Sequence, residues 1–152
     1  LSPAARRKLA GEIAKKLRKS QQQRIKQQKA PDGSPYQARK RQPLRAKTGR
    51  IKRTMFQKLR TSRYMKATGR ENSAVVEFTG KVQRIARIHH FGLMDSPNKY
   101  SREIVYSKRE MLGFSEVDKN IVERLVINHI QWLECLIRVK CLHLIRRLIE
   151  NG

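Results

Sequence analysis

The first 50 residues contain too few apolar side chains to bury a core of their own. Leu, Ile, Val and Phe occur there only six times, as Leu1, Leu9, Ile13, Leu17, Ile25 and Leu44. A segment this poor in apolar groups cannot offset the entropy of ordering its chain. We therefore expect this stretch to lie on another part of the protein or on a partner, or to stay partly disordered.

Positive charge is concentrated in the same half of the chain. Residues 1–70 carry 23 Lys and Arg against two acids, Glu12 and Asp32, whereas residues 71–152 carry 13 against 10. A segment with a net charge of +21 repels itself and attracts polyanions. The expected partner is nucleic acid, an acidic protein surface or, less readily, an anionic membrane.

One stretch of this half is the best candidate for contact with a partner or with the DNA backbone. Its cationic residues are Arg39, Lys40, Arg41, Arg45, Lys47, Arg50, Lys52 and Arg53. The only nearby aromatic residues are Tyr36 and Phe56, so stacking on bases is not expected, while contact with phosphates is. A solvated basic loop explains the pattern equally well.

The periodicity along the chain predicts an α+β protein with a small antiparallel sheet, made of a hairpin and one short strand and packed by helices. A long basic N-terminal helix and a long C-terminal helix complete this prediction. The elements expected are a helix from Pro3 towards residue 29, a turn over 30–35, a short helix around Ile51, Met55, Phe56 and Leu59, strands at 64–68 and 74–80, a helix at 82–91, a strand at 104–106, and a helix beginning after a capping box at Ser115.

Three parts follow from this assignment. Residues 1–63 form a protruding basic helix–loop–helix arm, 64–130 an α+β core, and 131–152 a C-terminal helical extension of uncertain role. We expect Val82, Ile85, Ala86 and His89 on the buried face of one helix, and Phe91 and Leu125 in the core. Arg41 is expected to be exposed.

The C-terminal extension carries an apolar stripe at helical spacing. The stripe consists of Leu133, Ile137, Cys141, Leu144 and Leu148. Such a stripe either folds back on the core or remains disordered, or it binds a partner or a second copy. No uncharged apolar run long enough to span a membrane occurs, and the spacing of Cys135 and Cys141 predicts two reduced thiols in a cytoplasmic setting.

No group of residues in the sequence indicates catalysis, a cofactor or a metal. Adjacent residues on a helix point about 100° apart, so His89 and His90 are poor joint ligands, and His89 is expected to be a core histidine. The spacing of Cys135, Cys141 and His143 matches no standard zinc site. We therefore predict that the chain is not an enzyme and needs no cofactor.

Six segments in a fixed order resemble one known family. They are residues 2–9, Gln21–Ile25, Ala30–Tyr36, 48–60, His89–Gly92 and Leu112–Phe114. Their order and spacing are similar to those of the tail completion proteins of contractile-tailed temperate bacteriophages, the phage virion morphogenesis family. Members carry a further helical segment before the position where this chain starts, and the sequence from 131 onwards is unlike theirs.

The resemblance implies a non-enzymatic structural protein of virion assembly that completes the tail and enables head–tail joining. Related connection proteins are small α+β subunits that form rings, commonly hexameric, so the implied partners are further copies, other tail proteins and connector proteins. The implied locations are the bacterial host cytoplasm during assembly and the head–tail junction of the virion. The alternative is a non-specific nucleic-acid-binding protein. Strong, salt-dependent binding of DNA by the isolated monomer would favour this alternative.

Overall fold

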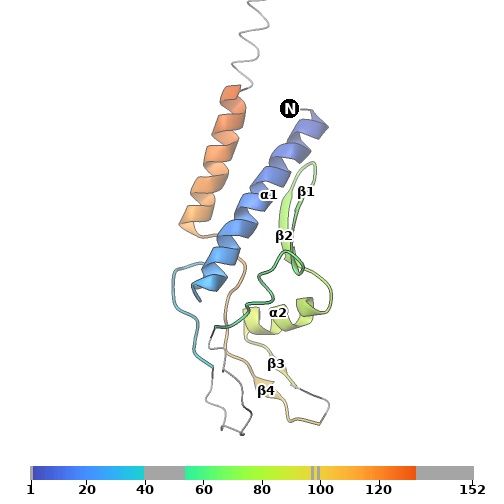
Figure 1. Ribbon diagram of the computed structural model, residues 1–152, viewed down its shortest axis with the longest axis vertical. Helices are drawn as coiled ribbons and strands as arrows, with labels where there is room; N and C mark the ends of the chain where they lie inside the picture. Colours follow the sequence, from blue (N-terminus) through green and yellow to red (C-terminus); the bar gives the residue numbers. More distant parts are fainter. Residues whose placement is uncertain (1, 40–53, 97, 99, 133–152) are drawn as a thin grey trace, which may run out of the picture.

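The computed structural model describes residues 2–39, 54–96, 98 and 100–132. Three helices and two small antiparallel sheets make up this part, which confirms the predicted α+β class. The long helix α1 lies between the C-terminal helix and the β1–β2 hairpin, and α2 and the β3–β4 ribbon lie at the other end of the molecule (Figure 1). No described helix is long and apolar enough to cross a membrane.

Helix α1 spans Pro3–Lys26 and begins where the sequence predicted. The Ser2 hydroxyl accepts a hydrogen bond from the Ala5 amide at 3.2 Å, and Pro3 occupies the first helical position. The helix ends before Gln28, whose φ is +59°. The predicted turn follows, stabilised by Asp32, whose Oδ1 atom accepts hydrogen bonds from the Ser34 amide and hydroxyl.

One face of α1 is buried against the hairpin. The residues of this face are Ala10, Ala14, Leu17, Gln21 and Ile25. Helix α1, the main element of the N-terminal stretch, therefore lies on another part of the same chain, whereas residues 40–50 lie outside the described part. The buried core contains side chains from both sides of residue 63. The division of the chain into an arm before this residue and a core after it stays a prediction.

Strands β1 (Met65–Gly69) and β2 (Ala74–Phe78) form the predicted antiparallel hairpin. Met65 pairs with Phe78, and both side chains are buried, whereas the neighbouring pair of Lys66 and Glu77 is exposed. This alternation is the period of two that distinguishes a strand with one buried face.

The predicted short helix around Phe56 is wrong for its described part. Residues 54–63 form bends and turns, and Phe56 has a φ of +62°. This left-handed backbone conformation interrupts a right-handed helix. It directs the Phe56 ring towards Tyr36 and His89, with ring centroids 5.9 and 5.1 Å apart.

Helix α2 (Val82–Phe91) ends at Gly92, which adopts the left-handed conformation with φ of +70°, as predicted. Ala86 is buried and Val82 and His89 are half-buried, which confirms three residues of the predicted face, whereas Ile85 is half exposed and Ile88 is buried instead. Phe91 is 58% exposed and does not belong to the core, contrary to our prediction.

The predicted short strand belongs to a second sheet rather than to the hairpin. Strand β4 (Ile104–Val105) pairs antiparallel with β3 (Met94–Asp95), which the sequence had not indicated. The two sheets share no strand.

The C-terminal helix covers residues 116–132 of the described chain. Its predicted capping box is confirmed: the Ser115 amide donates to Asp118 Oδ2 at 2.9 Å, and the Asp118 amide donates to the Ser115 hydroxyl at 3.2 Å. Leu125 is half-buried. The predictions about Cys135, Cys141, His143 and the stripe from Leu133 to Leu148 concern residues outside the described part.

Candidate interaction surfaces

Of the cationic residues in the basic candidate stretch, only Arg39 belongs to the described part of the chain. That side chain is exposed, and its charge contributes to lowering the pKa of His89, after burial and the charge of Arg109. The other predicted contact residues lie outside the described residues. They are Lys40, Arg41, Arg45, Lys47, Arg50, Lys52 and Arg53.

The chain leading into this stretch is held by Arg109, which is only 6% exposed. Its Nε atom donates to the Gln37 carbonyl at 2.8 Å, and its Nη2 atom donates to the Ala38 carbonyl at 3.3 Å. Burial and the charge of Arg39 lower the pKa of Arg109. Sequence reasoning missed this residue because Lys108, Arg109 and Glu110 look like an ordinary solvated charged run.

A second attachment holds the chain just after the stretch. The Gln28 amide donates to the Met55 carbonyl at 3.0 Å and accepts from the Met55 amide at 2.8 Å. One side chain thereby satisfies both backbone groups of Met55, as a neighbouring strand would. The ends of the basic stretch are therefore fixed to the folded part of the chain.

His89 and His90 serve the packing of α2. The His89 ring contacts Phe56 and Tyr106 edge to face, with centroids 5.1 and 4.8 Å apart, and its Nδ1 atom is buried without a hydrogen-bond partner. His90 Nδ1 accepts a hydrogen bond from the Met111 amide at 3.2 Å. Among the described residues, no cluster of three His, Cys, Asp or Glu could hold a metal ion.

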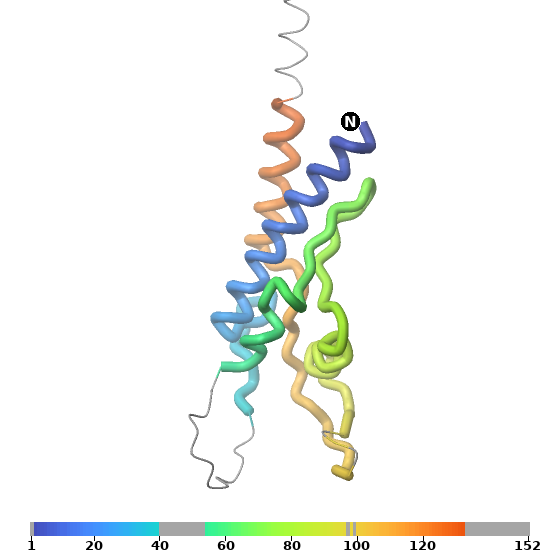
Figure 2. The backbone as a smooth tube through the Cα atoms, turned by 45° about the vertical axis from the view of Figure 1, so that its right-hand side comes forward, coloured from blue at the N-terminus to red at the C-terminus, as the bar shows by residue number. Residues whose placement is uncertain are grey.

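An open groove of about 910 Å³ runs between α1 and the C-terminal helix, which lie side by side in both backbone views (Figures 1 and 2). Lys16, Lys19 and Gln23 line the side formed by α1, and the exposed Phe114 and Val117 line the other. The lining is mixed in charge, because Asp32, Glu110 and Glu116 also belong to it.

A buried ion pair joins the two helices beside this groove. Arg24 Nη1 lies 2.5 Å from Asp118 Oδ2, and Arg24 Nη2 donates to the Gly113 carbonyl at 2.9 Å. Asp118 is fully buried, and burial alone would raise the pKa of its carboxyl group. Hydrogen bonds from Ser20 and Ser115, together with the charge of Arg24, outweigh burial and hold the pKa below its ordinary value.

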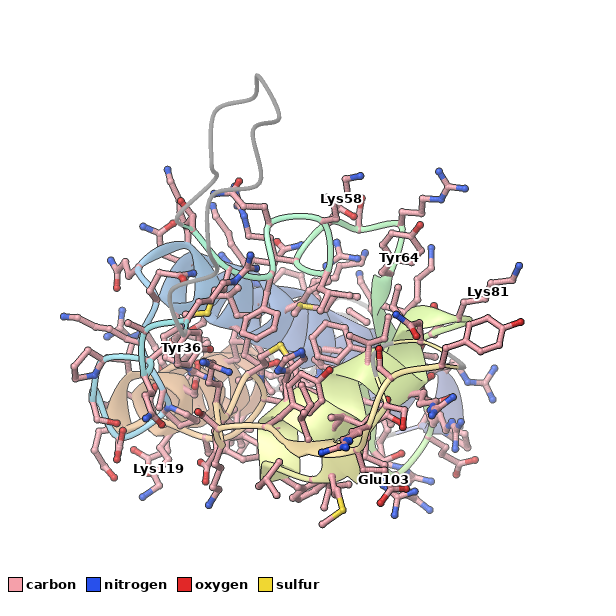
Figure 3. All side chains as sticks on the ribbon, turned by 90° about the horizontal axis from the view of Figure 1, so that it is seen from below. Tyr36, Lys58, Tyr64, Lys81, Glu103 and Lys119 are labelled. Carbon is pink, nitrogen blue, oxygen red and sulfur yellow. The ribbon has the colours of Figure 1, made fainter. Side chains whose placement is uncertain are left out.

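The end of the molecule formed by α2, β3 and β4 exposes large apolar side chains, and we call it the apolar tip. Its members are Ile85, Phe91, Leu93, Met94, Ile104 and Val105, each 39–64% exposed. Monomeric proteins rarely expose so many neighbouring apolar residues unless another protein covers them. The view from this end shows the charged side chains of Lys58 and Lys81 extending outwards at the rim (Figure 3).

Comparison with known proteins gives one family and one close relative. The model of the phage virion morphogenesis family matches residues 1–131. The chain is 46% identical over 132 residues to tail completion protein S of Escherichia phage P2, which covers 86% of this chain and 88% of that protein. No solved structure shows a significant match.

Proposed function

The chain belongs to the phage virion morphogenesis family, and from this premise we propose that it completes the phage tail so that the tail can join a DNA-filled head. Membership in this family gives it a part in phage tail assembly. The similarity to a tail completion protein over 86% of the chain is the observation that carries the finer proposal. The role is structural rather than enzymatic, and its place is the virion tail at the head–tail junction, after assembly in the host cytoplasm.

Complementation tests this function. A derivative of phage P2 whose tail completion gene is inactivated is grown in cells that produce this chain. If the chain completes tails, infectious phage reappear at a titre far above that of cells with an empty vector. Normal production of this chain without any rise in titre, while the relative itself restores infectivity, would refute the proposal.

We also propose that the subunit works as a homo-oligomeric ring, with the hexamer as the expected form. The apolar tip supports self-association because Met94 and Val105, which face each other across the ribbon, are 59% and 64% exposed. Light scattering of the purified chain is expected to give the mass of a discrete oligomer. The double change Met94→Ser and Val105→Ser should shift it to the monomer, whereas Arg102→Ser, an exposed control, should not. If the unchanged chain stays monomeric even after purified tails are added, the ring is contradicted.

The basic stretch from Arg39 to Arg53 is proposed to contact acidic tail or connector proteins, or the backbone of DNA that passes the junction. The anchoring of Gln37, Ala38 and Met55 supports this role, because fixed ends lower the entropy lost when a segment binds. Replacing Arg41, Arg45 and Arg50 by Gln should lower the complementing titre without lowering the melting temperature. An unchanged titre would exclude this role.

A further inference from the structure

The exposed side of α1 presents positive charge and almost no apolar surface. Ten residues of this helix are exposed, and six of them are cationic: Arg7, Lys8, Lys15, Lys16, Lys19 and Lys26. The other four are Pro3, Ala4, Glu12 and Gln23. A single acid among ten exposed positions leaves this side strongly positive.

Four of these lysines form a straight row along the helix. Lys8, Lys15, Lys19 and Lys26 follow one another at intervals of seven, four and seven residues. At about 100° per residue they lie within about 20° of one line, and at about 1.5 Å per residue the line is about 27 Å long. This lysine row lies on the side of α1 opposite the buried residues Leu17 and Gln21.

The lysine row has no acidic partner in the described part of the chain. The arginines of α1 that face neighbouring elements are paired, Arg6 with Glu71 and Arg24 with Asp118. The remaining ion pairs among the described residues involve Arg84, Lys108 and Lys119. Folding therefore neutralises the inner arginines of α1 and leaves the lysine row available.

The composition of this surface selects its partner. The centres of protein–protein interfaces are rich in aromatic and apolar residues and poor in Lys, whereas phosphate contacts use Lys as a point charge. Helix α1 contains no aromatic residue that could stack on a base. We propose that the lysine row of α1 binds the phosphate backbone of duplex DNA without reading its sequence, an activity that goes beyond tail completion and does not depend on ring formation.

Anisotropy of a fluorescent duplex of arbitrary sequence, titrated with the full chain at several salt concentrations, tests this. The test variant replaces Lys8, Lys15, Lys19 and Lys26 by Gln, which retains high helix propensity. The control variant removes four exposed cations elsewhere: Lys58, Lys66, Lys81 and Arg87, each by Gln. Both variants lose the same net charge, so they differ only in where the charge is removed.

The slope of the logarithm of the binding constant against the logarithm of salt concentration should fall by about 3.6 in the test variant, at about 0.9 per phosphate contact. Affinity at moderate salt should fall at least about tenfold, and much less in the control variant. Equal losses in the two variants, or no salt-dependent binding by the unchanged chain, would overturn the proposal. A test variant that loses binding to poly-glutamate but keeps its affinity for the duplex would overturn it in favour of an acidic protein partner. Complementation of the phage does not decide this question, so the two proposals can fail separately.

Discussion

Replacing Gly69 by Ala should separate α1 from the hairpin. A Cβ atom at this position would lie 2.5 Å from Gly11 Cα and 2.7 Å from the Arg7 carbonyl oxygen, and closer still to the Gly11 amide nitrogen. All three atoms belong to the backbone of α1, so no side-chain rotation can relieve the clash. Carbon atoms pack best at about 3.5–4.0 Å, so the helix has to move away by about 1 Å.

The cost of this movement is that of an overpacked core. Such insertions typically cost about 1–3 kcal/mol, and the rigidity of the neighbouring atoms places this one at about 3 kcal/mol. For a chain of this size, about 2–4 °C of melting temperature is lost per kcal/mol, which gives a decrease of about 6–12 °C. Thermal unfolding followed by circular dichroism measures it directly.

Gly11→Ala is the matched control, because Gly11 is the residue of α1 that Gly69 approaches. A Cβ atom at Gly11 meets nothing within 4 Å, and the residue lies inside a helix. Ala is about 1 kcal/mol more favourable than Gly in a helix interior, so this change should raise the melting temperature. A Gly69→Ala variant that melts within about 1 °C of the unchanged chain would refute the close approach.

Three further predictions concern the core and its charged groups. Asp118→Ala should lower the free energy of unfolding by about 3–5 kcal/mol in urea titration, because Arg24 then stays buried without its partner; a double change to Arg24→Met and Asp118→Leu should cost less than that single change. Met65→Ala should cost about 3 kcal/mol, since the side chain is fully buried, whereas Phe91→Ala should stay within about 1 kcal/mol, and equal losses would contradict the assignment of the core. Burial, followed by the charges of Arg109 and Arg39, lowers the pKa of His89, so the unfolded chain takes up the proton first, and stability present above about pH 6.5 should fall as pH decreases towards the lowered pKa. His89→Leu should reduce this slope of the urea midpoint against pH, and an unchanged slope would show that His89 does not titrate in this way.

The elements that sequence reasoning predicted correctly are those fixed by neighbouring residues. The Ser2 cap, the strand at Ala74–Phe78, Gly92 at the end of α2 and the Ser115 capping box each depend on side chains within a few positions. Such local preferences act in the same way wherever the chain lies.

The elements that were missed depend on distant contacts. Phe56 is helical by local pattern, but its contacts with Tyr36 and His89 stabilise a left-handed conformation. Phe91 continues an apolar periodicity, yet no described element of the chain covers it to the extent of a core residue. Nothing in the sequence pairs β3 with β4, because strands of two residues give no measurable alternation.

The sequence predicts the charge of the candidate interaction surface but not which residues form it. The composition predicts a cationic surface that attracts polyanions, and both this binding and its location in the basic stretch containing Arg39 stay predictions. The sequence did not reveal the lysine row, because only burial of the opposite side of α1 shows which lysines face outwards. Arg109 could not be distinguished from its charged neighbours until its carbonyl partners were known.

The inward face of α1 also determines when the protein can fold during its synthesis. Helix α1 leaves the ribosome before its ion-pair partners, because Arg6 is paired with Glu71 and Arg24 with Asp118, 65 and 94 positions later. At roughly 5–20 residues per second, the last partner follows after roughly 5–19 seconds. During that interval Arg6 and Arg24 lack the carboxylates that pair with them in the fold, and the positive net charge of the N-terminal half disfavours contact between nascent chains.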